Sequence, residues 1–308
     1  LALEEALLTR HEGGVCLYLW QNRSTVVIGR NQNAWRECRV DLLESEGGVL
    51  SRRSTGGGAV YHDLGNLNFS FIADKARYDV PRQLSVLAEA VSDFGLRAEV
   101  SGRNDLLLGA GGEKFSGNAF RVGENACLHH GTILIGVDME RLSRYLAPSP
   151  EKLRAKGVSS VRARVTNLCA HCPAVTAESM KAAMLAAFRR VYGPAERLEA
   201  DAFAGPALDA LEARYASWAW RFGRTPPFDL SLTARFDWGG VELLLRFERG
   251  LASGVRLYTD SLDERLPETV ESALRGAACA GPAMRERLAQ SGSPEARDIG
   301  SWLGGLRF

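Results

Sequence analysis

Two arginines and three consecutive glycines form the segment of this sequence that points most directly to chemistry. It lies between two strand-like runs and reads Arg52-Arg53-Ser54-Thr55-Gly56-Gly57-Gly58-Ala59-Val60-Tyr61-His62-Asp63. Because glycines lack Cβ atoms, their backbone N–H groups can approach a ligand closely, and guanidinium groups match carboxylate or phosphate oxygens. We therefore predict that the loop binds an anion. A flexible hairpin with solvated arginines is the alternative for so short a motif.

Asn104 and Asp105 are the candidate metal ligands. They follow Gly102 and Arg103 and immediately precede a strand-like run. An amide oxygen beside a carboxylate is a donor pair that Mg²⁺ accepts when substrate phosphates complete its shell. The competing interpretation is a simple turn, because Gly, Asn and Asp are all turn-forming residues.

Lys114 is the candidate catalytic residue. The chain has 38 basic residues, of which only five are lysines and 33 are arginines; the lysines are Lys75, Lys114, Lys152, Lys156 and Lys181. An ammonium is a compact charge that suits a single oxyanion developing during a reaction. A solvated surface lysine is the alternative, because most lysines are exposed.

Two common nucleotide motifs are absent from the sequence. The glycine-rich residues 109–112 are not a phosphate-binding loop, because Glu113 and Phe115 interrupt the required Gly-Lys-Ser/Thr order. No Gly-x-Gly-x-x-Gly run follows a strand and opens a helix, so a Rossmann site is unsupported.

The cysteine and histidine motifs give weaker signals. Cys169, His171 and Cys172 offer too few ligands for a structural zinc site without a second cluster. His129 and His130 are adjacent, and since neighbouring strand residues face opposite ways, at most one of them lines a pocket.

The elements that must position these residues alternate irregularly. Alternating or β-branched runs predict strands at residues 15–20, 25–29, 49–52, 66–71, 98–100, 105–108, 113–121 and 132–136. Amphipathic patterns predict helices at 1–8, 41–46, 82–94, 177–191, 268–274 and 284–290, and residues 229–249 read as strands around a turn at 238–240. This order favours an α/β or α+β fold on a mixed, largely antiparallel sheet over a doubly wound one.

Composition limits the class of protein. With 308 residues, 45% hydrophobic and 24% charged, the chain is long enough for a large and a small globular domain, and the Pro/Gly-punctuated residues 218–227 are the candidate boundary. A net charge of +1 without Lys/Arg runs argues against nucleic-acid binding. The sequence contains no apolar stretch of 18 residues, so we expect no membrane span. Six scattered cysteines favour a reducing compartment, the cytoplasm or an organelle matrix. The opening without Met leads us to expect a short native segment before Leu1.

Read together, these motifs resemble the lipoate-protein ligase A family of the biotin/lipoate ligase superfamily. The matching segments, in order, are residues 52–66, 102–106, 114–121, 129–132 and 155–168, with further agreement at 236–242 and 258–262. The resemblance implies a catalytic domain related to biotin ligases and class II synthetases over residues 1–222, with mixed, mostly antiparallel sheet and flanking helices. It also implies a small α+β accessory domain over 226–308.

The resemblance further implies a two-step reaction. Lipoate and ATP give lipoyl-AMP and pyrophosphate with Mg²⁺ present, and the lipoyl group then passes to a lysine of an apo lipoyl domain, from a 2-oxoacid dehydrogenase or the glycine cleavage H-protein. By the same resemblance, residues 155–168 cover the adenylate as a lid.

Each site residue receives a role from the resemblance alone. Lys114 is catalytic and contacts both substrates. Arg53, Gly58, Ala59, Val60 and Tyr61 hold ATP; Ser54, Gly56, Gly57, Gly58, His62 and Arg121 hold lipoate; Asn104 and Asp105 hold the metal.

Three other functions remain open from the residues. One is an ATP-independent lipoyl or octanoyl amidotransferase that uses Cys172 as its nucleophile. Another is a biotin ligase, which the Gly-Arg run at residues 29–35 faintly resembles. The third is a non-catalytic module that binds a lipoyl group.

Overall fold

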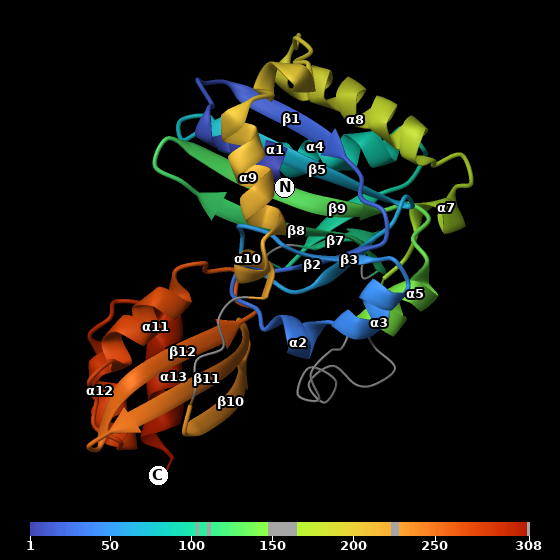
Figure 1. Cartoon of the computed structure of the whole chain (residues 1–308). Helices are drawn as coiled ribbons and strands as arrows, with labels where there is room; N and C mark the ends of the chain where they lie inside the picture. The colour runs from blue at the N-terminus through green and yellow to red at the C-terminus, as the bar shows by residue number, and fades with distance from the viewer. Residues whose placement is uncertain (103–104, 110–111, 147–164, 223–227, 307–308) are drawn as a thin grey trace.

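Two units of different size make up the chain. The computed structural model describes residues 1–308 except 103–104, 110–111, 147–164, 223–227 and 307–308. Figure 1 shows the larger unit with the N-terminus and the smaller one ending at the C-terminus. Among the described residues, no helix is long and apolar enough to cross a membrane.

A six-stranded antiparallel sheet forms the centre of the larger unit. Its spatial order is β1 (Val15–Trp20), β5 (Asn66–Asp74), β9 (Ala126–Leu134), β8 (Lys114–Val122), β7 (Asp105–Leu108) and β6 (Ala98–Ser101). Strand β5 is buried on both faces over nearly its whole length.

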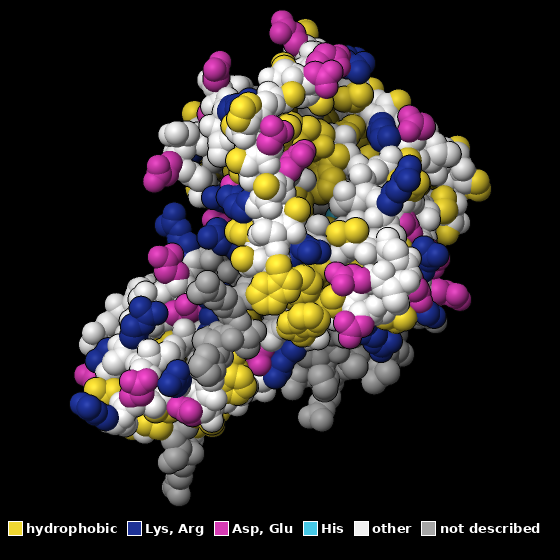
Figure 2. Space-filling model, in the orientation of Figure 1, with side chains coloured by type: hydrophobic (Ala, Val, Ile, Leu, Met, Phe, Trp, Pro, Cys, Tyr) yellow, Lys and Arg dark blue, Asp and Glu magenta, His cyan; other side chains and the backbone are white. Residues whose placement is uncertain are grey.

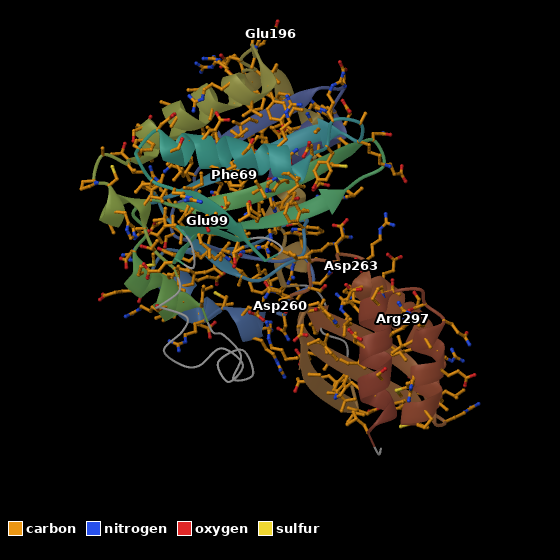
Figure 3. All side chains as sticks on the ribbon, turned by 180° about the vertical axis from the view of Figure 1, so that it is seen from behind. Phe69, Glu99, Glu196, Asp260, Asp263 and Arg297 are labelled. Atoms are coloured by element: carbon orange, nitrogen blue, oxygen red, sulfur yellow. The ribbon has the colours of Figure 1, made fainter. Side chains whose placement is uncertain are left out.

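Two helices cover one face of this sheet: α4 (Val80–Ser92) and α8 (Ala177–Tyr192). The Asp79 side chain caps α4, and Thr176 with Ser179 forms a capping box on α8. Their apolar stripes pack on Phe69, Phe71 and other core residues of the sheet. Figure 3 shows Phe69 between this sheet and α4.

A second, smaller sheet carries the glycine loop. Strand β2 (Thr25–Ile28) pairs in parallel with β3 (Val49–Arg52) and antiparallel with β4 (Val60–His62), and the loop joins β3 to β4. Short helices lie around it: α2 (Ala34–Glu37), α3 (Val40–Ser45), α5 (Met139–Tyr145) and α10 (Trp218–Phe222). Between α10 and α2, the Phe222 ring stacks on Trp35 and on Trp218. Figure 2 shows hydrophobic side chains gathered on this face of the molecule, near the middle of the view.

The remaining elements of the larger unit are mostly helical. Helix α1 (Ala2–Thr9) packs against α9 (Pro206–Ala216) and the 3₁₀ helix η2 (Ala200–Phe203). Helix α7 (Leu168–His171) follows residues 147–164 and contributes Leu168 to the core under α8.

The C-terminal unit has a core of its own. Strands β10 (Leu230–Phe236), β11 (Gly239–Glu248) and β12 (Leu251–Thr259) form an antiparallel sheet covered by α11 (Leu266–Leu274), α12 (Gly281–Ala289) and α13 (Pro294–Gly304). Figure 3 shows Asp260 and Asp263 where this unit meets the larger one. The limits 1–222 and 226–308 remain our proposed division into domains.

The expected α+β fold with a mostly antiparallel sheet is confirmed, with some elements missed. The sequence analysis did not predict β4, β12, α5, α9 or α13, and it started the strand of His129 and His130 too late, at residue 132 instead of 126. Because β9 is buried on both faces at its centre, it carries no polar/apolar alternation there. All six cysteines are free.

Candidate active site

A cavity of about 160 Å³ lies between the glycine loop and the large sheet. Residues paired across antiparallel strands share a face, and one such row runs through Trp20, Asn68, Thr132 and Gly117. All four line the cavity. Phe69, which alternates with Asn68, points to the helices instead. The cavity therefore lies on the face opposite α4 and α8.

The glycine loop forms the second wall of the cavity. Gly57, Gly58, Ala59, Val60 and His62 line it, as does Arg53. The Arg53 guanidinium donates to the carbonyls of Gly56, Gly58 and Val27, and to the Thr55 hydroxyl. These hydrogen bonds fix the conformation of the loop, and Arg53 also borders the cavity.

Residues from distant segments hold the loop in place. A Cβ at Gly29 would lie 2.0 Å from the carbonyl oxygen of Gly57, so only glycine permits that approach. From the C-terminal unit, the Ser261 carbonyl accepts a hydrogen bond of 2.9 Å from the Gly57 N–H. The C-terminal unit therefore contacts the loop that lines the cavity.

Lys114 and Asp105 form an ion pair at the edge of the cavity. The Lys114 Nζ lies 2.6 Å from Asp105 Oδ1, and both side chains are about one-third exposed. Gly117 faces Asp105 across the β7–β8 pair, and a Cβ there would lie 2.8 Å from Nζ, so the missing side chain makes room for the ammonium. The β7–β8 pairing is also irregular between Leu106 and Leu107, a feature that redirects side chains at strand edges.

A buried chain of polar groups supports the floor of the cavity. The His130 Nδ1 lies 2.7 Å from Glu4 Oε1, and its Nε2 lies 2.7 Å from the Thr55 hydroxyl in the glycine loop. Burial acts to raise the pKa of Glu4, but the His130 ring and the Ser70 hydroxyl outweigh it, so this pKa lies below its ordinary value. Helix α1 is thereby linked through β9 to the loop.

The two adjacent histidines face opposite sides of β9. His130 lines the cavity, whereas His129 lies on the core face between Gln83 and Asn118. The prediction that at most one of them lines a pocket is confirmed.

Several predicted site residues do not line the cavity. Ser54 and Gly56 lie in the loop but not on its cavity side, and the Tyr61 ring packs in the core beside Tyr145. Arg121 shares the strand face of Gly117, but its Nε lies 3.7 Å from Glu264 of the C-terminal unit. Asn104 lies outside the described residues, as do positions 155–164 of the expected lid.

The second arginine of the opening motif has a structural role. Arg52 is buried and donates to the carbonyls of Gly29, Gln32 and Arg221, among others. It therefore does not present free donors to a ligand, in contrast to the expectation for both flanking arginines.

The cysteine motif is separate from the cavity. Cys172 packs partly against the main core, and His171 Nε2 lies 2.9 Å from the Thr166 hydroxyl. Neither cysteine lines the cavity, and the described residues hold no group of three or more His, Cys, Asp or Glu placed to bind a metal.

Sequence reasoning missed Asn68, Trp20 and Gly117 as cavity residues, and it left the role of His130 open. The alternation of Asn66, Asn68 and Ser70 with apolar residues in β5 was the available signal, because a buried face that carries amides and hydroxyls is unusual in a sheet. Their convergence on one cavity depends on strand register, which the sequence alone does not reveal.

A cavity lined by apolar and polar groups, with a lysine at its edge, is typical of a binding site for a small molecule. Residues 1–189 match the family model described as lipoyl protein ligase A/B catalytic domain, and 225–297 match the bacterial lipoate protein ligase C-terminus. The chain belongs to the lipoate-protein ligase family.

Solved structures agree with this assignment. The lipoate complex of LipL1 from P. falciparum has a TM-score of 0.85 and 26% identity, with 98% of this chain and 94% of that chain covered. The bipartite lipoate protein ligase of Thermoplasma acidophilum, described with its E2 lipoyl domain, has a TM-score of 0.64 and 28% identity over 74% and 92% of the two chains. A lipoate-protein ligase A bound with ATP has a TM-score of 0.61 and 26% identity over 72% and 92%.

Proposed function

We propose that this chain is an ATP-dependent lipoate-protein ligase. The observation that carries the proposal is the Lys114 ammonium at the edge of the acyl cavity, held there by Asp105 and by the missing side chain of Gly117. The similarity to structures described with lipoate and with ATP supports both substrates.

In the first step, the lipoate carboxylate attacks the α-phosphorus of ATP, lipoyl-AMP forms and pyrophosphate leaves. Two anions must meet, so the main task of the site is to neutralise charge with groups placed in advance. Lys114 would bridge the carboxylate and the α-phosphate. The acyl chain occupies the cavity between Trp20, Val27 and the large sheet.

The remaining roles follow the family resemblance. Arg53 with residues 58–61 would border the nucleotide, while Ser54, residues 56–58, His62 and Arg121 would surround lipoate. For Arg121 this requires that it leave its ion pair with Glu264.

Asp105 fits a magnesium site because its carboxylate is a hard oxygen donor and is one-third exposed. Together with Asn104 it would hold Mg²⁺, which when bound supplies charge to the phosphate oxygens.

In the second step, the amine of an acceptor lysine attacks the lipoyl carbonyl, AMP leaves, and the amine loses a proton. The acceptors that we propose are apo lipoyl domains of 2-oxoacid dehydrogenases or of the glycine cleavage H-protein, in the cytoplasm or an organelle matrix.

The test is the intact mass of an apo lipoyl domain incubated with this chain, lipoate, ATP and Mg²⁺. The expected result is a lipoyl-sized mass gain that requires ATP. A gain without ATP that is lost in Cys172→Ala would favour an amidotransferase, and binding without any mass gain would favour a non-catalytic module.

A further inference from the structure

Two buried hydrogen-bond donors in the acyl cavity have no partner among the described residues. They are His62 Nε2 and Asn68 Nδ2, and their residues are only 3% and 1% exposed. Both residues line the cavity. Because buried polar groups are nearly always paired in folded proteins, two orphaned groups at one cavity indicate a ligand atom that they contact.

The hydrogen bonds made by their other atoms identify both groups as donors. Asn22 Nδ2 lies 3.2 Å from His62 Nδ1, and an amide nitrogen only donates, so Nδ1 accepts. Burial, with Arg53 nearby, lowers the pKa of His62 to about 3, so the ring is neutral and carries its one proton on Nε2. Asn68 Oδ1 accepts from Asn66 Nδ2 at 3.0 Å, which leaves Asn68 Nδ2 as a donor.

Both donors lie toward the end of the cavity away from Lys114. Asn68 and Gly117 share one row but are separated by strand β9, so they lie two strand spacings apart, roughly 10 Å. The Lys114 ammonium lies over Gly117, and the His62 ring lies beside Trp20 at the opposite end of the row. A carboxylate at Lys114 therefore directs the tail of its acyl chain toward His62 and Asn68.

We propose that His62 and Asn68 donate hydrogen bonds to the dithiolane sulfurs of lipoate and thereby select it over acyl chains without an acceptor atom. This inference deepens the proposed function and rests on lipoate as the substrate. Sulfur is a soft, weak acceptor. The selection arises because lipoate offers an acceptor to both buried donors, whereas an all-carbon tail leaves them unpaired.

The sharpest comparison uses a ligand with the shape of lipoate but no sulfur, namely pentanoic acid carrying a terminal cyclopentyl ring. Titration calorimetry without ATP measures its affinity and that of lipoate for the full chain. We expect lipoate to bind about tenfold more tightly or better, the penalty of unpaired buried donors. Equal affinities in the wild-type chain would overturn the inference without any variant.

His62→Phe removes one donor and keeps a flat ring beside Trp20, and partly exposed Asn22 can turn to water. The preference for lipoate should fall several-fold in His62→Phe and again in His62→Phe/Asn68→Leu. Val27→Ala is the matched control, because it enlarges the same cavity without touching a donor and should weaken both ligands alike. A preference that survives in the double variant refutes the role of these donors.

The two proposals can fail separately. If the chain prefers lipoate through His62 but produces no lipoate-dependent ATP–pyrophosphate exchange, this inference stands and the ligase proposal falls. If exchange occurs with lipoate and the cyclopentyl acid at equal efficiency, the ligase proposal stands and this inference falls.

Discussion

Adding one methyl group at Gly117 should slow the reaction at this site without unfolding the chain. A Cβ there would lie 2.8 Å from Lys114 Nζ and 3.0 Å from Cε. Ordinary contacts begin near 3.4 Å, so the ammonium must move by at least several tenths of an ångström and lose its fit against Asp105. The obstructed atoms are the far end of a flexible side chain, so the strand itself need not shift.

The magnitude follows from the task of the ammonium. A displacement of about 1 Å in a reacting group costs on the order of a hundredfold in rate, so Gly117→Ala should lower lipoate-dependent ATP–pyrophosphate exchange by about ten- to a hundredfold. Gly136→Ala is the control, because its Cβ would meet only Cys169 Sγ, at an ordinary 3.5 Å. The thermal midpoints of both variants should stay close to that of the wild type.

Unchanged exchange in Gly117→Ala would refute this reasoning. It would mean that the position of Lys114 over Gly117 is not the one used in the reaction. A large drop in the thermal midpoint would instead show that the new methyl group disturbs the sheet and not the lysine.

Three further predictions concern the ammonium, a buried arginine and a buried histidine. Lys114→Ala should lower the exchange rate by about a thousandfold with folding intact, since the oxyanions lose their placed cation; near-normal exchange would show that another group is catalytic. Arg52→Met should lower the free energy of unfolding in urea by about 3 kcal/mol or more, because buried carbonyls lose their donor; an unchanged midpoint would contradict this. The pKa of His62 is lowered to about 3 from 6.5, so the unfolded chain takes up the proton first as pH falls, and stability present above pH 6.5 is lost toward pH 3. Urea unfolding at several pH values should show a slope of up to about 1.4 kcal/mol per pH unit from this residue, absent in His62→Phe; identical slopes would show that His62 does not titrate in this way.

The sequence contained enough local information for the family and for most of the framework. Period-two alternation identified β5, and amphipathic spacing placed α4 and α8 within two residues of their observed starts. The three consecutive glycines gave the loop, because only that residue type allows backbones to approach as closely as Gly29 and Gly57 do. Adjacent positions alone showed that His129 and His130 must face opposite ways.

Tertiary structure decided which of those residues reach the cavity. Its residue type alone predicts that Arg52 binds an anion, yet its guanidinium donates to the carbonyl of Arg221, 169 positions later in the chain. Asn68 and Gly117 meet the cavity only because β5, β9 and β8 pair in one register, and a slip of one residue would turn Asn68 into the core.

The sequence by itself therefore determined the chemistry available to this protein, because residue types and local spacing set backbone preference and charge. Only the folded chain decided where that chemistry is used. Most buried polar groups are paired with a group that lies near them in the fold, and here those partners come from segments far apart in the sequence.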